Sequence, residues 1–151
     1  MSQEKLKKLA NQVSGSAPQV KILLVDDDSN DLRFYCATLH LHGCLVWPVA
    51  SYAEGAASVQ KLDVDLVIVS QGSPAFEGRC VVESAIARDR RLPVLVLTRH
   101  IDMGCYLEAM QLGAVDYLEK PPEPAAILQL VRSHLWPPAA PARDQLACHA
   151  C

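Results

Sequence analysis

The sequence predicts an α/β fold in which helices cover both faces of a five-stranded parallel sheet. Short apolar runs end abruptly at polar or turn-forming residues, and stretches with a helical spacing of apolar residues separate these runs. The two kinds of segment alternate along the chain. Because neighbouring parallel strands need a crossover helix between them, this alternation is typical of a doubly wound sheet.

Five apolar runs are expected to form the strands. The third run is followed by a loop that contains Gly72, Pro74 and Gly78, which do not extend a strand easily, so this strand is expected to end at Ser70. The second run contains Pro48, which lacks a backbone N–H and therefore predicts an edge strand. The strands are expected at residues 20–25, 45–50, 66–70, 93–98 and 114–118.

Five stretches with helical spacing are expected to form the helices. Ser29 or Asn30 can cap the first of them, and Gly43 can end it. The apolar face of this helix is expected to contain Leu32, Phe34, Tyr35, Leu39 and Leu41. The other helices are predicted at residues 52–61, 79–89, 103–112 and 124–135.

A chain of 151 residues is long enough for one domain with a substantial core. We assign this domain to residues 20–135. Residues 1–19 carry apolar side chains at helical spacing among lysines and then a break, so a short helix and a linker are expected there. Residues 136–151 are rich in Pro, Ala and Cys and are expected to form a flexible tail.

The composition argues against several classes of protein. A net charge of −3 and a hydrophobic content of 50% disfavour both a disordered chain and a strongly basic nucleic-acid binder. The cluster Arg88, Arg90 and Arg91 is interpreted as a solvated helix end, because no aromatic stacking platform accompanies it. No signal peptide or membrane-spanning run is visible, so we expect a cytoplasmic protein without membrane contact. The six cysteines are then expected to be reduced, and Cys36, Cys80 and Cys105 to be buried in helices.

Polar residues follow four of the predicted strands at the point where each strand ends. Three carboxylates, Asp26, Asp27 and Asp28, follow the first strand, and Ser70 and Thr98 end the third and fourth strands. Lys120 follows the fifth strand. If the strand order is the flavodoxin-like 2-1-3-4-5, these residues lie together at the topological switch point, where ligands of open α/β sheets bind.

With these features the sequence resembles the receiver domain of bacterial two-component response regulators, across about residues 20–135. The segments ILLVDDD, DLVIV, VLVLT and YLEKP, with Pro74 and Gly78 between them, occur in the order and spacing of that family. The resemblance implies an acidic pair that holds Mg²⁺ and a cis bond between Lys120 and Pro121. It assigns Asp26 and Asp27 to the acidic pair, Thr98 to the switch hydroxyl, Tyr117 to the switch aromatic and Lys120 to the lysine that binds phosphoryl oxygens.

The sequence departs from the family at the phosphoacceptor position, which Ser70 occupies in place of aspartate. A serine hydroxyl is a poor nucleophile without an adjacent base and offers a weak, neutral oxygen to Mg²⁺. We therefore expect no required cofactor, and weak Mg²⁺ binding at most through Asp26 and Asp27. A serine hydrolase is disfavoured as well, because none of the histidines lies in a recognisable catalytic motif.

Two further departures lie beside the predicted site. Gln71, Gly72 and Ser73 replace bulky apolar residues of the family, and Arg99 replaces a small residue. We expect Arg99 to pair with Asp27 or Asp28 and to occlude the pocket, and Lys120 to pair with the acidic residues.

These departures predict an atypical receiver that is not an enzyme and that acts by protein–protein interaction, independently of phosphorylation. In the family the interaction face corresponds to residues 103–135, where a protein partner or a second copy of the chain would bind. A transcription factor is disfavoured, because nothing after residue 136 resembles a DNA-binding domain.

Two other functions remain open from the sequence. The segment Cys148, His149 and Cys151 has ligands for a soft metal and thiols that oxidants attack, so the chain is alternatively a redox- or metal-responsive module. The chain is also interpretable as a phosphorelay receiver with a different acceptor, Asp27 or Asp28.

Overall fold

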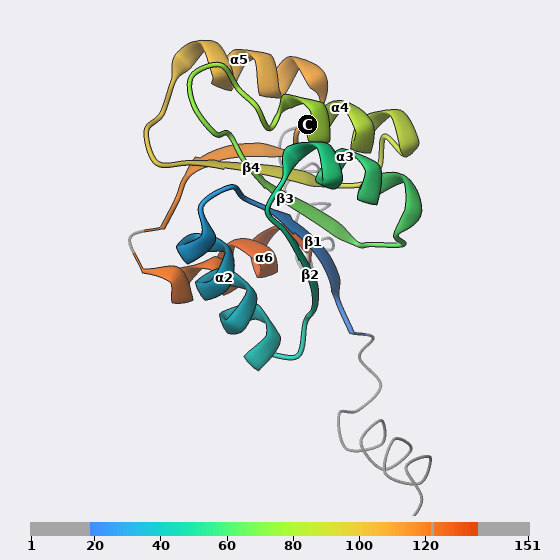
Figure 1. The fold of residues 1–151 in the computed structure, drawn as a ribbon, viewed down its shortest axis with the longest axis vertical. Helices are drawn as coiled ribbons and strands as arrows, with labels where there is room; N and C mark the ends of the chain where they lie inside the picture. Colours follow the sequence, from blue (N-terminus) through green and yellow to red (C-terminus); the bar gives the residue numbers. More distant parts are fainter. Residues whose placement is uncertain (1–18, 122, 136–151) are drawn as a thin grey trace, which may run out of the picture.

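A computed structural model describes residues 19–121 and 123–135 of the chain. Its five strands are all parallel and lie in the order β2-β1-β3-β4-β5, as the sequence predicts (Figure 1). The strands are β1 (Lys21–Val25), β2 (Leu45–Val49), β3 (Leu66–Ser70), β4 (Val94–Thr98) and β5 (Asp116–Glu119).

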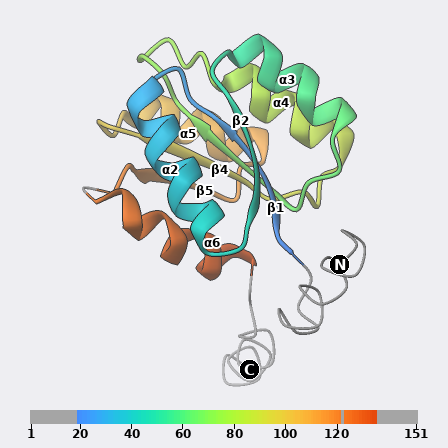
Figure 2. The ribbon, with the colours of Figure 1, turned by 60° about the horizontal axis from the view of Figure 1, so that its bottom comes forward.

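Five helices and one short 3₁₀ helix connect and follow these strands. They are α2 (Ser29–Leu41), α3 (Tyr52–Lys61), α4 (Arg79–Arg88), α5 (Met103–Leu112), η1 (Pro124–Ala126) and α6 (Ile127–Leu135). Helices α3, α4 and α5 cover one face of the sheet, and α2 and α6 lie side by side on the other (Figures 1 and 2). The fold is therefore the doubly wound, flavodoxin-like one.

The alternation of side chains along each strand divides the core into two layers. In β1, Leu23 and Val25 pack under α3, α4 and α5, whereas Ile22 and Leu24 pack under α2 and α6. Strands β3 and β4 are buried along their whole length. This burial on both faces explains why these strands appear in the sequence as continuous apolar runs.

Strand β2 lies at the edge of the sheet, where Pro48 pairs in register with Leu24 of β1. An edge strand tolerates proline because one side of its backbone has no strand to donate to. The prediction of an edge position from Pro48 is therefore confirmed.

Helix α2 differs from the prediction at its start and in its apolar face. Its cap is Asp28, whose carboxylate accepts hydrogen bonds from the amides of Asn30 and Asp31, and not Ser29 or Asn30. Phe34 is 54% exposed and Leu41 is 82% exposed, because α2 turns only its Tyr35 and Leu39 side to the sheet. Helical spacing alone does not show how wide the covered side of a helix is.

Strand β5 is shorter than predicted at its start. Strand β5 begins at Asp116 instead of residue 114, since Ala114 is buried in the loop after α5 and Val115 is 45% exposed. The predicted N-terminal helix and the predicted tail after residue 135 lie outside the described residues, apart from Gln19. Of the helices that the structure does describe, none combines the length and the apolar character needed to cross a membrane.

Gly78 lets the loop after β3 fold back against the end of that strand. A Cβ atom at this position would lie 2.2 Å from the backbone carbonyl oxygen of Ser70. Because a backbone atom cannot move aside cheaply, Gly78→Ala is expected to lower the free energy of unfolding by about 2 kcal/mol or more. Urea unfolding followed by circular dichroism measures this change.

The matched control is Gly104→Ala at the exposed start of α5. There the new Cβ atom would meet only the carboxylate of Asp102, at 3.2 Å, and alanine favours a helix over glycine by about 1 kcal/mol. This variant is expected to be as stable as the parent chain or more stable. Equal losses in the two variants would contradict the role assigned to Gly78.

Candidate functional site

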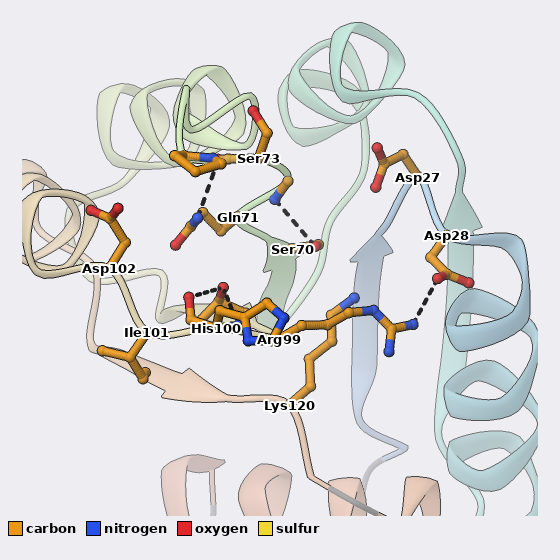
Figure 3. A pocket seen from close by; sticks show the side chains of 13 residues that line it. Asp27, Asp28, Ser70, Gln71, Ser73, Arg99, His100, Ile101, Asp102 and Lys120 are labelled. Atoms are coloured by element: carbon orange, nitrogen blue, oxygen red, sulfur yellow. Dashed lines mark hydrogen bonds and ion pairs between the residues drawn. The ribbon is translucent and has the colours of Figure 1, made fainter.

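The carboxyl ends of the strands surround a cavity of about 400 Å³ (Figure 3). The cavity lies where the connections from β1 and β3 diverge, which is the topological switch point of this sheet. Its walls come from the loops after β1, β3 and β4 and from the residue after β5. The lining residues are Asp27, Asp28, Ser70, Gln71, Gly72, Ser73, Pro74, Thr98, Arg99, His100, Ile101, Asp102 and Lys120.

A buried ion pair at this cavity joins the residue after β1, Asp26, to the residue after β5, Lys120. The Nζ atom of Lys120 lies 2.8 Å from Oδ2 of Asp26, and the two side chains are 7% and 3% exposed. The second oxygen of Asp26 accepts a hydrogen bond from the Asp28 amide at 2.9 Å. Burial raises the pKa of Asp26, and the Lys120 and Asp28 hydrogen bonds oppose this rise. Lys120 thus supplies an opposite charge to this buried carboxylate.

Asp31 links this ion pair to Arg99. One oxygen of Asp31 lies 2.8 Å from Nζ of Lys120 and 2.7 Å from Nη2 of Arg99. The same Nη2 atom is 2.7 Å from Oδ2 of Asp28. The amide of Asp31 and the guanidinium of Arg99 hold the pKa of Asp28 below its ordinary value. Two cations and three carboxylates therefore form one network, Asp26–Lys120–Asp31–Arg99–Asp28.

Arg99 crosses from the end of β4 to the start of α2, over one side of the cavity (Figure 3). Its partners are Asp28 and Asp31, so the expected pairing with Asp28 is present and the pairing with Asp27 is not. The Arg99 side chain remains 56% exposed and lies at the surface of the network. Sequence reasoning missed Asp31, although its position three residues after the cap Asp28 places both carboxylates on one side of the helix.

Asp27 is exposed, whereas its neighbour Asp26 is buried. Its carboxylate accepts a hydrogen bond of 3.1 Å from the hydroxyl of Tyr52, the first residue of α3. Burial raises the pKa of Tyr52, so this hydroxyl stays a proton donor at neutral pH. Sequence reasoning missed Tyr52, since its partner depends on how α3 follows β2.

The carboxylates in this arrangement have partners within the chain and are not arranged as a Mg²⁺ site. Both oxygens of Asp26 already accept hydrogen bonds, and Asp27 is directed toward Tyr52. Within residues 19–121 and 123–135, no three His, Cys, Asp or Glu side chains gather as a metal-binding group. Mg²⁺ requires near-octahedral oxygen ligands, which these carboxylates would supply only after leaving their present partners.

Ser70 ends β3 with its side chain at the cavity and is 6% exposed. Its hydroxyl oxygen accepts a long hydrogen bond of 3.4 Å from the amide of Gly72. An amide is a donor and not a base, so this contact does not activate the hydroxyl as a nucleophile.

Thr98, at the end of β4, is also buried beside the cavity. Its hydroxyl donates to the carbonyl oxygen of His100 at 2.9 Å and accepts from the amide of His100 at 3.3 Å. The hydroxyl therefore stabilises the turn after β4. The bond between Lys120 and Pro121 is trans and not cis as the resemblance implies, because the described residues contain no cis peptide bond.

Gln71 and Tyr117 form a buried polar contact beside Ser70. Gln71 is 2% exposed and Tyr117 is 4% exposed, and the Tyr117 hydroxyl donates to Oε1 of Gln71. The same hydroxyl accepts a hydrogen bond of 3.1 Å from the amide of Asp102, the cap of α5. Burial raises the pKa of Tyr117, so its hydroxyl keeps its proton. The sequence marks Gln71 as unusual but does not show its partner, which lies 46 residues away.

The cysteines differ in exposure, and the prediction that all three helical ones are buried is wrong for Cys80. Cys105 is buried, which raises its pKa to about 11, whereas Cys36 is half-buried and Cys80 is exposed. Cys80 lies in the first turn of α4, where its thiol contacts the carbonyl oxygens of Tyr52 and Glu77 at 3.6 Å and 3.5 Å and remains exposed. Cys148 and Cys151 lie outside the described residues.

A family model described as the response regulator receiver domain matches residues 22–132. The chain belongs to this family. The receiver is 31% identical over 122 residues to the transcriptional regulatory protein FixJ of Azorhizobium caulinodans, which covers 81% of the chain and 58% of FixJ. It is 37% identical over 115 residues to the response regulator protein FleR of Pseudomonas aeruginosa, covering 76% of the chain and 24% of FleR.

Solved receiver structures have the same fold. A CheY-like receiver domain from Methanospirillum hungatei superimposes with a TM-score of 0.72 at 24% identity, over 78% of this chain and 94% of that one. A chemotaxis response regulator of Vibrio cholerae gives 0.68 at 26% identity, over 77% and 98%. The chain thus matches whole receiver domains, and it spans less than two thirds of the length of FixJ and FleR.

The Lys120–Asp26 pair in the receiver can be tested by removing its cation. In Lys120→Met, Asp26 is left buried without this partner, which is expected to cost about 3–5 kcal/mol of unfolding free energy at neutral pH. Loss of Lys120 leaves burial to raise the pKa of Asp26 further in the folded state. The cost is therefore full above that raised pKa and shrinks as the pH falls through it, because protonation removes the buried charge.

The control is the double variant Lys120→Met with Asp26→Asn. It removes both buried charges and is expected to recover most of the lost stability at neutral pH. Urea unfolding of the wild type and of the single and double variants measures both effects. The measurements run from about pH 4, near the ordinary pKa of a carboxylate, to about pH 8. A Lys120→Met cost that does not change with pH would contradict the assignment of Asp26 as the charge that Lys120 compensates.

Proposed function

We propose that this receiver signals without phosphorylation of an aspartate and without enzymatic activity of its own. The observation that carries the proposal is Ser70 at the end of β3, where the family resemblance implies the acceptor aspartate. A serine there provides neither the carboxylate that forms an acyl phosphate nor a contact that activates its hydroxyl. The engagement of Lys120 and Arg99 by carboxylates of the chain supports the same proposal.

In the proposed function no cofactor is required, and Asp26 and Asp27 bind Mg²⁺ weakly at most. Binding would have to break the Asp26–Lys120 pair or the Asp27–Tyr52 hydrogen bond. Ser70 also removes one full negative charge from the ligand set that a receiver would offer to the ion.

The receiver acts, in this proposal, through a protein partner that binds the face formed by residues 103–135. Helix α5 and the segments beside it expose a cluster of large apolar side chains at this face. The cluster consists of Met103, Tyr106, Leu107, Met110 and Val115, which are 36% to 64% exposed. Clustered exposed apolar side chains are typical of a binding surface, so the partner is expected to bring apolar side chains to α5.

Beryllofluoride with Mg²⁺ tests the absence of phosphorylation chemistry. Wild-type receiver is expected to form no adduct, because the ligand needs an aspartate carboxylate at the strand end. Ser70→Asp restores that carboxylate and is expected to bind Mg²⁺ at least about tenfold more tightly and to form the adduct. NMR chemical shifts of the residues that line the cavity measure both.

The control is Ser133→Asp, which adds the same charge at an exposed position of α6. It is expected to behave as wild type. A beryllofluoride adduct in wild type, or a phosphoryl group on any aspartate after treatment with acetyl phosphate, would contradict the proposal.

The apolar cluster is tested by placing a charge in it. Leu107→Glu is expected to weaken partner binding at least about tenfold, because a carboxylate would be buried in an apolar contact. Phe34→Glu, at a 54% exposed position on the opposite face of the sheet, is the matched control. Quantitative affinity capture from extracts of the native cell, with the three proteins compared at equal loading, measures the difference.

Analytical ultracentrifugation distinguishes a different protein from a second copy of the receiver as the partner. Self-association that Leu107→Glu abolishes would identify the partner as a second copy of the receiver. Equal capture by wild type, Leu107→Glu and Phe34→Glu would contradict the assignment of this face.

A further inference from the structure

The loop after Ser70 is connected to the start of α5 by a chain of buried and half-buried hydrogen bonds. The Gln71 backbone is fixed from both sides, because its amide donates to the Leu97 carbonyl at 2.8 Å and its carbonyl accepts from the Gly78 amide at 3.1 Å. Its side-chain Nε2 donates to the Ser73 carbonyl at 3.1 Å, which leaves Oε1 directed at the Tyr117 hydroxyl. Gln71 thus presents a fixed acceptor to the tyrosine of β5.

Tyr117 carries this connection to α5. Its hydroxyl accepts from the Asp102 amide at 3.1 Å, and the Asp102 carboxylate in turn caps α5 through the Cys105 amide at 2.9 Å. The Tyr117 ring also packs edge-on against Tyr106, with ring centroids 5.7 Å apart. Tyr106 belongs to the exposed apolar cluster, so the position of Tyr117 affects both the start and the outer surface of α5.

Movement of Tyr117 out of this position would leave two polar groups without their partner. Gln71 is 2% exposed, so its Oε1 would lose its donor in a place that water does not reach freely. The Asp102 amide would lose its acceptor at the same time. Burying an unpaired polar group is unfavourable, and therefore the Gln71 contact favours the buried position of the tyrosine.

We propose that Gln71 is a positioning residue that holds Tyr117 buried and thereby fixes the start of α5 and the binding face around Tyr106. This inference rests on the proposed function, in which the face around α5 binds a partner and no phosphoryl group arrives to set its form. The fixed form then comes from a hydrogen bond inside the receiver. The conformation of α5 that the partner binds is then already the populated one. Binding therefore does not have to shift an equilibrium between two conformations.

The test replaces Gln71 with methionine, which has a similar length and no strong acceptor. In Gln71→Met the Asp102 amide is expected to exchange its hydrogen at least about tenfold faster, because its acceptor Tyr117 is no longer held. The ¹³C signals of the Tyr117 ring are expected to shift in the same variant. Gln71→Glu keeps a side-chain oxygen acceptor and is expected to restore the slow exchange.

Two further variants separate this role from a general loss of packing. Gln60→Met removes the contacts of Gln60 Nε2 to Ser84 between α3 and α4 and is expected to leave the Asp102 amide unchanged. Tyr117→Phe removes the hydroxyl from the other end of the contact and is expected to accelerate Asp102 exchange as Gln71→Met does, so the test does not depend on one variant folding. Unchanged Asp102 exchange in either Gln71→Met or Tyr117→Phe would overturn the proposal.

Beryllofluoride with Mg²⁺ distinguishes this failure from a failure of the proposed function. If wild type forms an adduct and its Tyr117 signals move, the proposed function fails, whatever Gln71 does. If wild type forms no beryllofluoride adduct, and Gln71→Met changes neither the exchange of the Asp102 amide nor the Tyr117 ring signals, only the role of Gln71 fails. Support for both is an unresponsive wild type together with a displaced Tyr117 in Gln71→Met.

Discussion

Asp26 and Lys120 form the ion pair on which the carboxyl edge of the sheet depends. The Asp26 carboxylate is buried at the end of β1, and a buried charge is costly unless an opposite charge and hydrogen bonds satisfy it. Lys120 supplies that charge from the end of β5, 94 residues further along the chain. Because the same Nζ atom also contacts Asp31, the start of α2 is tied to the pair, and Arg99 then joins Asp31 to Asp28.

The charge balance of this network favours a neutral side chain at position 70. An aspartate at the end of β3 would add a carboxylate to an edge where the two cations already have carboxylate partners. Such a site would need a further cation, which a bound metal ion supplies in the family pattern that the chain resembles. A neutral serine needs none. The charges around the pocket are therefore balanced by groups of the chain itself. Ser70 avoids an additional negative charge, and Arg99 neutralises carboxylates already present.

The sequence predicted the sheet and its order well, because continuous apolar runs report strands that are buried on both faces. It also predicted which strand ends converge, because the carboxyl ends of parallel strands lie at the same edge of the sheet. The pattern could not show the helix faces, since Phe34 has the spacing of a core residue and is exposed. Nor could it show that Tyr52 reaches the site, because this contact depends on the angle at which α3 leaves the sheet. Asp31 could have been found only from its spacing to Asp28, once Asp28 is recognised as the cap. The cap was predicted at Ser29 or Asn30, whereas the adjacent Asp28, which is equally suited to capping, is the cap in the structure.

Ser70 and Gln71 are neighbours whose side chains serve opposite sides of the strand end. Successive side chains of an extended backbone point in opposite directions, and the side chains of Ser70 and Gln71 point apart (Figure 3). The side-chain oxygen of Gln71 accepts a hydrogen bond from the Tyr117 hydroxyl. A bulky apolar residue at position 71 would offer the Tyr117 hydroxyl no acceptor. In the proposed function, Ser70 provides no carboxylate to receive a phosphoryl group, and Gln71 beside it provides a buried acceptor for the tyrosine. If the proposed function and the proposed role of Gln71 both hold, the two departures are linked physically, because α5 is then set by a hydrogen bond inside the receiver and not by a phosphoryl group.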